Sequence, residues 1–359
     1  MPERIYLDHA ATTPILPAAR EAVAEAMGRW ANPSSPHAEG RAARAALEDA
    51  RARIKAALGW NGDLIFTSGA TEAIAIALRG RGAYETNVSA VEHDAVMRHA
   101  EGPQRIEVDA DGLVSLDHLR AWLDPCGATA FIVIQAANNE TGVLQPYDEI
   151  VATIRADRVD KEVLVLADCA QTAGRLPLPA ADMIAVSAHK LGGPPGVGAL
   201  LVRDVARLSA TGGQERGYRG GTENLPAIIG FAAALEAAEP WLDRAAALRA
   251  RLETAIVAEG GEVIGANAAR LPTIGAYRMP GVAAAAQLIH FDLAGIAVSA
   301  GSACASGSLK TSHVLTAMGM DATAAGEVIR VSFGSSTDEA DVDAFLAQWR
   351  TLKARLRAA

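Results

Sequence analysis

The sequence has few cysteines, no long apolar segment and no excess of basic residues. Cys126, Cys169 and Cys304 lie far apart, without the paired spacing of a zinc site, and an odd number of thiols cannot all form disulfides. No apolar run approaches the length that spans a bilayer. The net charge of −9 argues against a general nucleic-acid-binding protein. Because the first residues also lack the pattern of a signal peptide, we expect a cytoplasmic protein whose cysteines stay reduced.

Hydrophobic residues make up 50% of the sequence, and many gather in short continuous runs that alternate with alanine-rich segments. Such runs are typical of strands buried on both faces, and the alanine-rich segments favour helices. The alternation predicts an α/β fold with a mainly parallel sheet. We expect strands at 63–68, 87–91, 131–136, 163–168, 182–187 and 198–202, and helices near 71–80, 93–100, 115–123 and 147–156.

The pattern changes near residue 225. An alanine- and leucine-rich stretch there predicts a long helix over 226–258. Further strands are expected at 273–278 and 327–334, and further helices near 283–291 and 338–357. This arrangement predicts a smaller α+β domain after the large one. We place the large domain at 15–240, and the small domain at 241–359 together with residues 1–14.

Polar residues follow the ends of the predicted strands. Gly69 to Glu72 open a helix, and free amides at a helix start bind phosphate well. Asp168 ends an apolar strand, where a carboxylate needs a cation or a donor. Lys190 follows another strand and precedes a glycine-proline loop. Because open α/β sheets bind ligands at the carboxyl ends of their strands, we expect these groups to meet. The same edge should carry His93, Asn138, Asn139, Glu140, Gln171, Ser187 and His189.

This combination matches the needs of pyridoxal 5′-phosphate. The cofactor needs a lysine to bond to, a carboxylate for its ring nitrogen, a helix start for its phosphate and a flat side chain against its ring. Each signal by itself also has an ordinary interpretation, because Gly-Ala-Thr forms turns and caps, and a lone histidine or lysine is more often structural. The loop at 192–198 superficially resembles a nucleotide-binding loop, but it lacks the lysine of that motif.

The chain resembles the cysteine desulfurases of the IscS/NifS type, members of the class V aminotransferase family. The resemblance runs from YLDHAATTP at 6–14 to VIRVSFGSST at 328–337, which is nearly the whole chain. The motifs between these ends are NPSSPHAEGR (32–41), FTSGATEA (66–73), VEHDAV (91–96), NNETGVLQP (138–146), DCAQTAGRLP (168–177), SAHKLGGPPGVGAL (187–200), GGQERGYRGGTEN (212–224) and SAGSACASGS (299–308).

The resemblance implies a fold and an activity. The fold would be the fold-type-I transferase fold of pyridoxal-phosphate enzymes. It would have a large domain with a mainly parallel seven-stranded sheet and a smaller α+β domain carrying a catalytic cysteine loop. The activity would convert L-cysteine to L-alanine and transfer the sulfur to an enzyme cysteine as a persulfide. That sulfur would serve iron–sulfur cluster or thio-cofactor biosynthesis.

The resemblance also implies roles around the cofactor ring. Lys190 would bond covalently to the cofactor. Asp168 would pair with the ring nitrogen, and Gln171 with the phenolic oxygen. His93 would stack on the ring and carry protons, and Asn139 would also touch the cofactor.

Further implied roles concern the phosphate and the substrate. Arg330, with Asn32 and Asn139, would bind the substrate carboxylate. Thr222 would reach the phosphate of a neighbouring subunit, which implies a homodimer with shared active sites. Within one subunit, the phosphate would be held by Ala70, Thr71, Ser187 and His189.

Cys304 lies among glycines, serines and alanines. A lone cysteine is usually a small buried hydrophobe, but such neighbours favour a loop with an exposed thiol. In the family this thiolate takes the sulfur, and it could ligate an iron–sulfur cluster transiently with a scaffold partner. We expect no intrinsic metal, and the expected partner is a sulfur-acceptor or iron–sulfur scaffold protein rather than nucleic acid or a membrane.

Other functions stay open at this point. A true aminotransferase or a selenocysteine lyase would use the same cofactor residues, although an aminotransferase does not need Cys304. A non-catalytic sulfur-relay subunit is more remote, because it would be expected to have lost Lys190, Asp168 or Cys304, and all of these are present.

Overall fold

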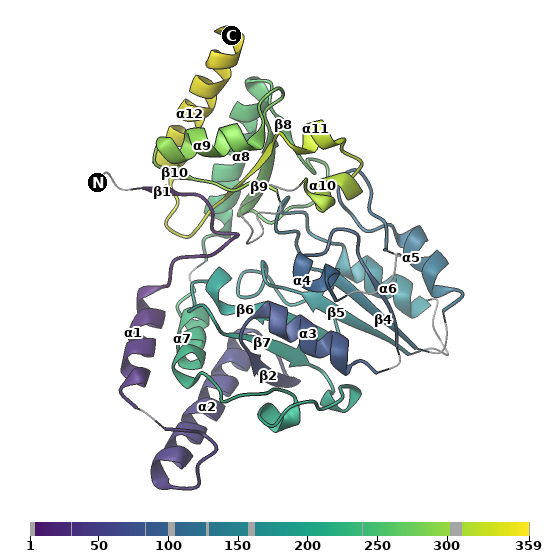
Figure 1. The fold of residues 1–359 in the computed structure, drawn as a ribbon, viewed down its shortest axis with the longest axis vertical. Coiled ribbons are helices and arrows are strands. Elements are labelled where there is room, and N and C mark those ends of the chain that lie inside the picture. Colours follow the sequence, from purple (N-terminus) through teal and green to yellow (C-terminus); the bar gives the residue numbers. More distant parts are fainter. Residues whose placement is uncertain are drawn as a thin grey trace.

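The computed structural model describes residues 4–29, 31–82, 84–99, 105–126, 129–156, 162–238, 240–301 and 311–358. Figure 1 shows two parts, one above the other. The lower part holds the large sheet with helices around it, and the upper part holds smaller sheets beside long helices. Cys304 lies outside the described residues.

Within the described ranges, the large sheet has six strands in the order β2-β7-β6-β5-β4-β3. Strands β3 to β6 run parallel to one another, and β7 is antiparallel to both β2 and β6. The expected α/β fold with a mainly parallel sheet is confirmed. The expected count of seven strands differs, because pairing beyond β3 is a single parallel bridge from Ser89 to Ile106 within the described residues. The strands are β2 (Asp63–Thr67), β3 (Glu85–Val88), β4 (Thr129–Gln135), β5 (Glu162–Asp168), β6 (Met183–Ser187) and β7 (Gly198–Val202).

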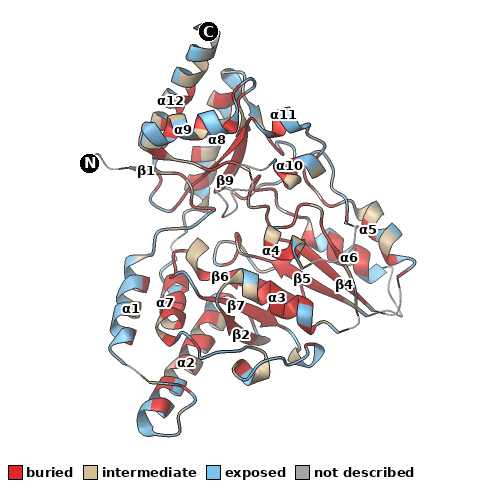
Figure 2. Ribbon diagram, viewed as in Figure 1, coloured by how far each residue is buried: buried red, intermediate tan, exposed pale blue. Residues whose placement is uncertain are grey.

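Helices cover both faces of this sheet, because alternate residues of each strand point to opposite faces. Phe131 and Val133 pack on the face covered by α3 (Ala70–Gly80) and α4 (Asp94–Met97). Ile132 and Ile134 pack on the other face. Figure 2 shows the strands buried along their length, which explains their continuous apolar sequences. The helices on the second face are α2 (Ala38–Ala57), α5 (Leu116–Leu123), α6 (Tyr147–Ala156) and α7 (Leu225–Glu236).

The upper part has its own apolar core. The side chains of Phe291 and Phe345 stack with their ring centroids 4.5 Å apart, and Trp349 packs beside them. The residues near the start of the chain belong here, because Ile5 pairs with Ile296. The two-domain division expected from the sequence, with its boundaries, stays a prediction. The strands are β1 (Ile5–Tyr6) with β10 (Ile296–Ala297), and β11 (Val328–Ser332), β9 (Ile274–Arg278) and β8 (Glu262–Val263) in that order. The helices are α8 (Leu242–Ala258), α9 (Ala284–Leu293), α10 (His313–Ala317), α11 (Ala322–Ala325) and α12 (Glu339–Ala358).

The continuous helix expected over 226–258 is wrong. The segment forms α7 and α8, and the chain leaves the helical path between Glu236 and Leu242. Pro240 lies in this break, and a proline inside a helix lacks an N–H and clashes with the preceding turn. The break lets α7 cover the large sheet while α8 joins the upper core.

Two helices before the first predicted strand were not expected. Helix α1 (Pro17–Met27) begins with a proline at its first position, and α2 begins where the His37 ring accepts the Gly40 N–H. Helix α1 packs against α7 on the outside of the large part. Within the described part of the chain, no helix combines the length and apolar character needed to cross a membrane.

Candidate active site

A cavity of about 920 Å³ lies at the carboxyl ends of the parallel strands, and residues of the upper part close it. Since β4, β5 and β6 all end at this edge, their following residues converge as expected for an open α/β sheet. The upper part contributes residues from β11 and from the segment before α10. The residues expected at the site that line the cavity are Ala70, Thr71, His93, Asn139, Asp168, Gln171, Ser187, His189, Lys190 and Arg330.

Lys190 lies in a short 3-10 helix, Ala188–Lys190, directly after β6. Its backbone is fixed because its carbonyl accepts hydrogen bonds from Thr13 Oγ1 at 2.9 Å and from Arg175 Nη2 at 2.5 Å. Burial lowers the pKa of Lys190 to about 8, although the nearby Asp168 carboxylate opposes this shift. A substantial share of this amine is therefore neutral near physiological pH, as a nucleophile requires.

Asp168 and Gln171 form the polar floor beside Lys190. Asp168 is 8% exposed, and its Oδ1 accepts the Ala170 N–H at 2.9 Å. Gln171 Nε2 donates to the Ala10 carbonyl at 2.9 Å, whereas its Oε1 is buried without a partner among the described residues. A buried polar atom without a partner is costly, so this atom marks where a polar ligand in the cavity would be favourable.

The start of α3 forms an anion cradle at the cavity wall. Gly69 has a φ of 152°, which favours glycine, and no side chain of the described residues caps the helix. Glu72 binds the Ser68 N–H and so leaves the first helical amides to the cavity. A Cβ on Gly69 would lie 3.6 Å from Ser187 Oγ, so the hydroxyl faces the same space. These donors fit a phosphate.

His93 caps the single turn of α4. Its Nδ1 accepts the Ala95 N–H at 3.1 Å, so the neutral ring carries its proton on Nε2. His93 is exposed to the cavity, but the walls withdraw it from bulk water, and this desolvation, with the charge of Lys190, lowers the pKa of His93. The ring is therefore neutral, and it can gain a proton only by giving up the cap.

Arg330 projects from β11 into the cavity and is already paired. Its Nη2 binds Asp8 Oδ1 at 2.7 Å, and its Nη1 donates to the Asn139 carbonyl at 2.9 Å. Its Nε is buried without a partner in the described part of the chain. Asp8 had no role assigned from the sequence, although it lies in the YLDHAATTP motif. An incoming carboxylate would have to share Arg330 with Asp8.

Three more polar residues, two of which line the cavity, had no role assigned from the sequence. Glu140 lines it, burial raises the pKa of its carboxyl, and its Oε2 accepts the Ser312 hydroxyl at 2.6 Å. His313 also lines it and bonds through Nε2 to the backbone carbonyl of Glu92 at 2.8 Å. Glu92 itself is fully buried behind His93, and desolvation raises the pKa of its carboxyl well above the ordinary value. The available signal in the sequence was that Glu92 directly follows the strand predicted at 87–91.

Two of the expected residues lie away from the cavity. Asn32 does not line the cavity, and its Oδ1 accepts the Ser34 N–H at 2.9 Å in a local turn. Thr222 is exposed outside the cavity of its own chain. Cys304 lies outside the described residues. The roles expected for these residues stay predictions.

The sequence and the structure were compared with known proteins. The family described as aminotransferase class-V matches residues 5–345. A cysteine desulfurase of Gluconacetobacter diazotrophicus is 39% identical, covering 98% of this chain and 94% of the relative. An IscS-like cysteine desulfurase of Mycobacterium tuberculosis is 38% identical, covering 99% of this chain and 97% of the relative.

Solved structures agree with these sequence matches. A NifS-like protein from Rickettsia africae superposes with a TM-score of 0.90 at 32% identity, covering 98% of this chain and 100% of that one. The likeness thus includes both parts of the molecule.

Proposed function

This chain belongs to the class-V aminotransferase family, among its pyridoxal-phosphate-dependent cysteine desulfurases, and we propose that it converts L-cysteine to L-alanine and transfers the sulfur to Cys304 as a persulfide. The observation that carries this proposal is the convergence of a phosphate cradle, Asp168 and a partly neutral Lys190 in one cavity.

The residues of the cavity fit the cofactor. The start of α3 and Ser187 would hold the phosphate, and Asp168 would face the ring nitrogen. Gln171 supplies a buried oxygen that still needs a partner. When bound, pyridoxal phosphate withdraws electrons from the substrate carbon that carries the amino group and weakens its bonds.

Side chains of the protein would transfer protons and bind the substrate. Lys190 provides an amine whose neutral fraction can act as a nucleophile and take up a proton. His93 offers the proton on Nε2 as a donor toward the cavity. Arg330, with an unsatisfied Nε and a shared Asp8, orients the substrate carboxylate.

Sulfur transfer needs a thiolate that can reach the substrate. Cys169 is fully buried, and burial raises the pKa of its thiol far above the ordinary value, so it does not supply a thiolate. Cys126 is buried as well. These two exclusions, together with the small and polar sequence around Cys304, support Cys304 as the sulfur acceptor within the chain.

The assembly and the sulfur acceptor are part of the proposal. Thr222 is exposed outside the cavity of its own chain, which supports a homodimer in which it serves the other subunit. A persulfide needs a protein acceptor, and an iron–sulfur scaffold or a thio-cofactor protein fits this chemistry. A reducing compartment keeps free thiols reduced, which supports the cytoplasm as its location.

The test is to incubate the purified protein with cofactor, a thiol reductant and L-cysteine. Alanine and sulfide should appear in equal amounts. Cys304→Ser should keep the cofactor and lose turnover by orders of magnitude, whereas Cys126→Ser and Cys169→Ser should stay close to normal. Transfer of amino groups to keto acids without sulfide would replace this function with that of an aminotransferase.

A further inference from the structure

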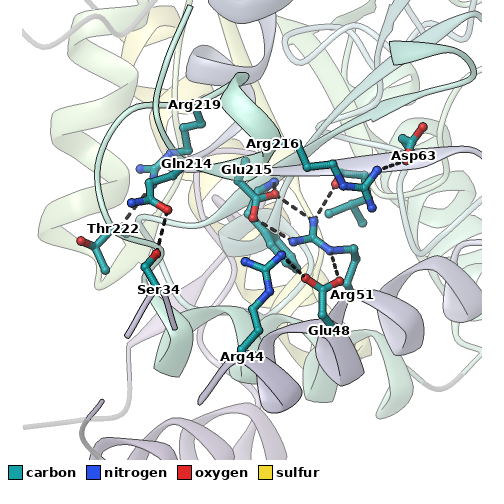
Figure 3. A network of polar contacts seen from close by, with 12 residues as sticks. Ser34, Arg44, Glu48, Arg51, Asp63, Gln214, Glu215, Arg216, Arg219 and Thr222 are labelled. Carbon is teal, nitrogen blue, oxygen red and sulfur yellow. Dashed lines mark hydrogen bonds and ion pairs between the residues drawn. The ribbon is translucent and has the colours of Figure 1, made fainter. Parts of the chain in front are cut away.

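Residues 212–222, called the arm below, begin in a strained turn. Glu215 and Arg216 have φ values of 49° and 59°, which residues other than glycine rarely adopt. The turn persists because the buried Glu215 carboxylate accepts two hydrogen bonds from Arg51, each at 2.8 Å (Figure 3). It also accepts the Phe66 N–H at 2.8 Å. The buried ion pair therefore fixes the direction in which the arm starts.

The arm then doubles back on itself. Gln214 and Arg219 exchange both backbone hydrogen bonds, at 2.8 and 3.2 Å. Gly212 packs against this pair so closely that a Cβ there would lie 2.2 Å from the Arg219 carbonyl carbon. The position of Arg219 therefore follows from the strained turn.

The guanidinium of Arg219 joins the end of the arm to the cavity wall. Its Nε donates to both carboxylate oxygens of Glu72, at 3.2 and 3.3 Å. Its Nη1 donates to the carbonyl of Gly221 at 3.2 Å and to that of Thr222 at 3.4 Å (Figure 3). Because Glu72 lies in the first turn of α3, one side chain holds Thr222 against the helix that forms the anion cradle.

Thr222 has few other restraints. It is exposed, and its hydroxyl has no hydrogen bond within the described part of the chain. Gly220 and Gly221 precede it, and Gly221 has a φ of 82°, so the backbone there is intrinsically free to move. On its other side, the buried Glu223 and the Asn224 cap lead into α7, so the contacts of Arg219 are what holds the glycine side of this threonine.

We propose that Arg219 is a positioning residue that fixes Thr222 for the cofactor phosphate in a second copy of the chain. This inference rests on the proposed homodimer and on the proposed role of Thr222. Without Arg219, Glu72 still accepts the Ser68 N–H, so the chain's own cradle stays in place. The loss of Arg219 should then weaken the partner's site and spare its own.

Mixed dimers can separate these two sites. Two differently tagged chains are produced together, and Lys190→Ala in one chain leaves a single lysine site. Arg219→Gln is placed either on the chain with Lys190 or on the chain without it. Cofactor affinity at the single site is measured from the visible absorbance of the lysine-linked cofactor. We expect affinity to fall about tenfold when the substitution is on the lysine-less chain, and to stay unchanged in the other arrangement.

The outcomes are distinct. Equal weakening in both arrangements, weakening only when Arg219→Gln shares the chain with Lys190, or no weakening in either would overturn the positioning role. Thr222→Ala in the same two arrangements tests the foundation: if it shows the arrangement dependence and Arg219→Gln does not, only the inference about Arg219 fails. A fully cofactor-bound monomer in sedimentation would overturn the dimer and the inference together.

Arg216→Gln is the matched control. Arg216 lies in the same arm, its side chain is 59% exposed, and it pairs with Asp63 at the surface. Exposed pairs contribute little, so this variant should bind the cofactor normally in both arrangements. A drop equal to that of Arg219→Gln would mean that any arginine loss loosens the arm, and it would overturn the specific role of Arg219.

Discussion

One buried arginine, Arg51, contacts the strained turn of the arm, and another, Arg330, lines the cavity. The two guanidinium groups differ in their hydrogen-bond partners. The side chains of Arg51 and Arg330 are both 9% exposed. Arg51 donates to Glu48, to the Leu64 carbonyl and twice to Glu215, whose side chain is 1% exposed. Arg330 has an unpartnered Nε in the described part of the chain. Its partner Asp8 is 21% exposed.

The difference separates a structural ion pair from a binding group. All three guanidinium nitrogens of Arg51 have partners and Arg51 does not line the cavity, so its contacts hold the arm. A guanidinium with a spare donor and an exchangeable counter-ion next to a cavity can take up a carboxylate. Burial alone would have treated the two arginines as equals.

Arg51→Met tests the structural ion pair and should have the largest effect, a loss of stability. It leaves the Glu215 carboxylate buried and unpaired, so the free energy of unfolding should fall by about 3–5 kcal/mol, measured by urea denaturation. Arg44→Met is the control on the same helix, since the Arg44 side chain is 47% exposed and should cost less than about 0.5 kcal/mol. An equal loss in both variants would contradict the structural assignment.

Arg330→Gln tests the arginine that binds the substrate carboxylate. It removes the fork that orients the substrate carboxylate, so kcat/KM for L-cysteine should fall by about 10²- to 10³-fold while cofactor content stays normal. Arg330→Lys keeps the charge without the fork and should fall in between. Near-normal kcat/KM in Arg330→Gln would assign substrate binding to another residue.

Lys190 adds a third cation to the comparison, one that the cavity walls desolvate and whose proton is exchangeable. Because burial lowers its pKa, the reactive amine forms as pH rises through about 8 and not through the ordinary 10.5. The rate at which the apoprotein bonds to pyridoxal phosphate should therefore rise about tenfold per unit below this value and then level off. A rate that keeps rising toward pH 10 would mean that the amine is not desolvated.

Asp8→Asn tests whether Asp8 competes with a ligand carboxylate for Arg330, and it should have the smallest effect of these variants. It removes the anion that competes for Arg330, so the dissociation constant of the product L-alanine should fall by about two- to fivefold. Asp343→Asn is a control, because Asp343 pairs with Arg251 on the surface. Weaker alanine binding in Asp8→Asn would show that Asp8 orients Arg330 and does not compete for it.

Local sequence patterns predicted the sheet edge well, because each strand end carries its own polar residues. Asp168 and Lys190 line the cavity because their strands are neighbours, which alternation of runs is enough to suggest. The partner of Arg330 could not be found this way, since Asp8 lies 322 residues away in the chain. The Arg51–Glu215 pair is likewise hidden, because it depends on how two distant segments pack.

Pro240 was a signal in the sequence against one continuous helix over 226–258. Composition alone favoured one helix over 226–258, but Pro240 divides it and separates two cores. Among the residues that the structure describes, the seventh strand expected by resemblance is reduced to one bridge, since pairing at a sheet edge depends on local backbone placement that resemblance does not specify.

The pairing of Ile5 with Ile296, and of Asp8 with Arg330, bears on how this protein is made. On the ribosome, the first strand is translated long before either partner exists. The large sheet can form during synthesis, since its strands end by Val202, but the cavity closes only when residues near 330 have emerged. Contacts of such long sequence separation form late and slowly. The nascent chain therefore carries an exposed first strand through most of its translation, and a chain truncated before β11 would lack Arg330 and the strand that positions it.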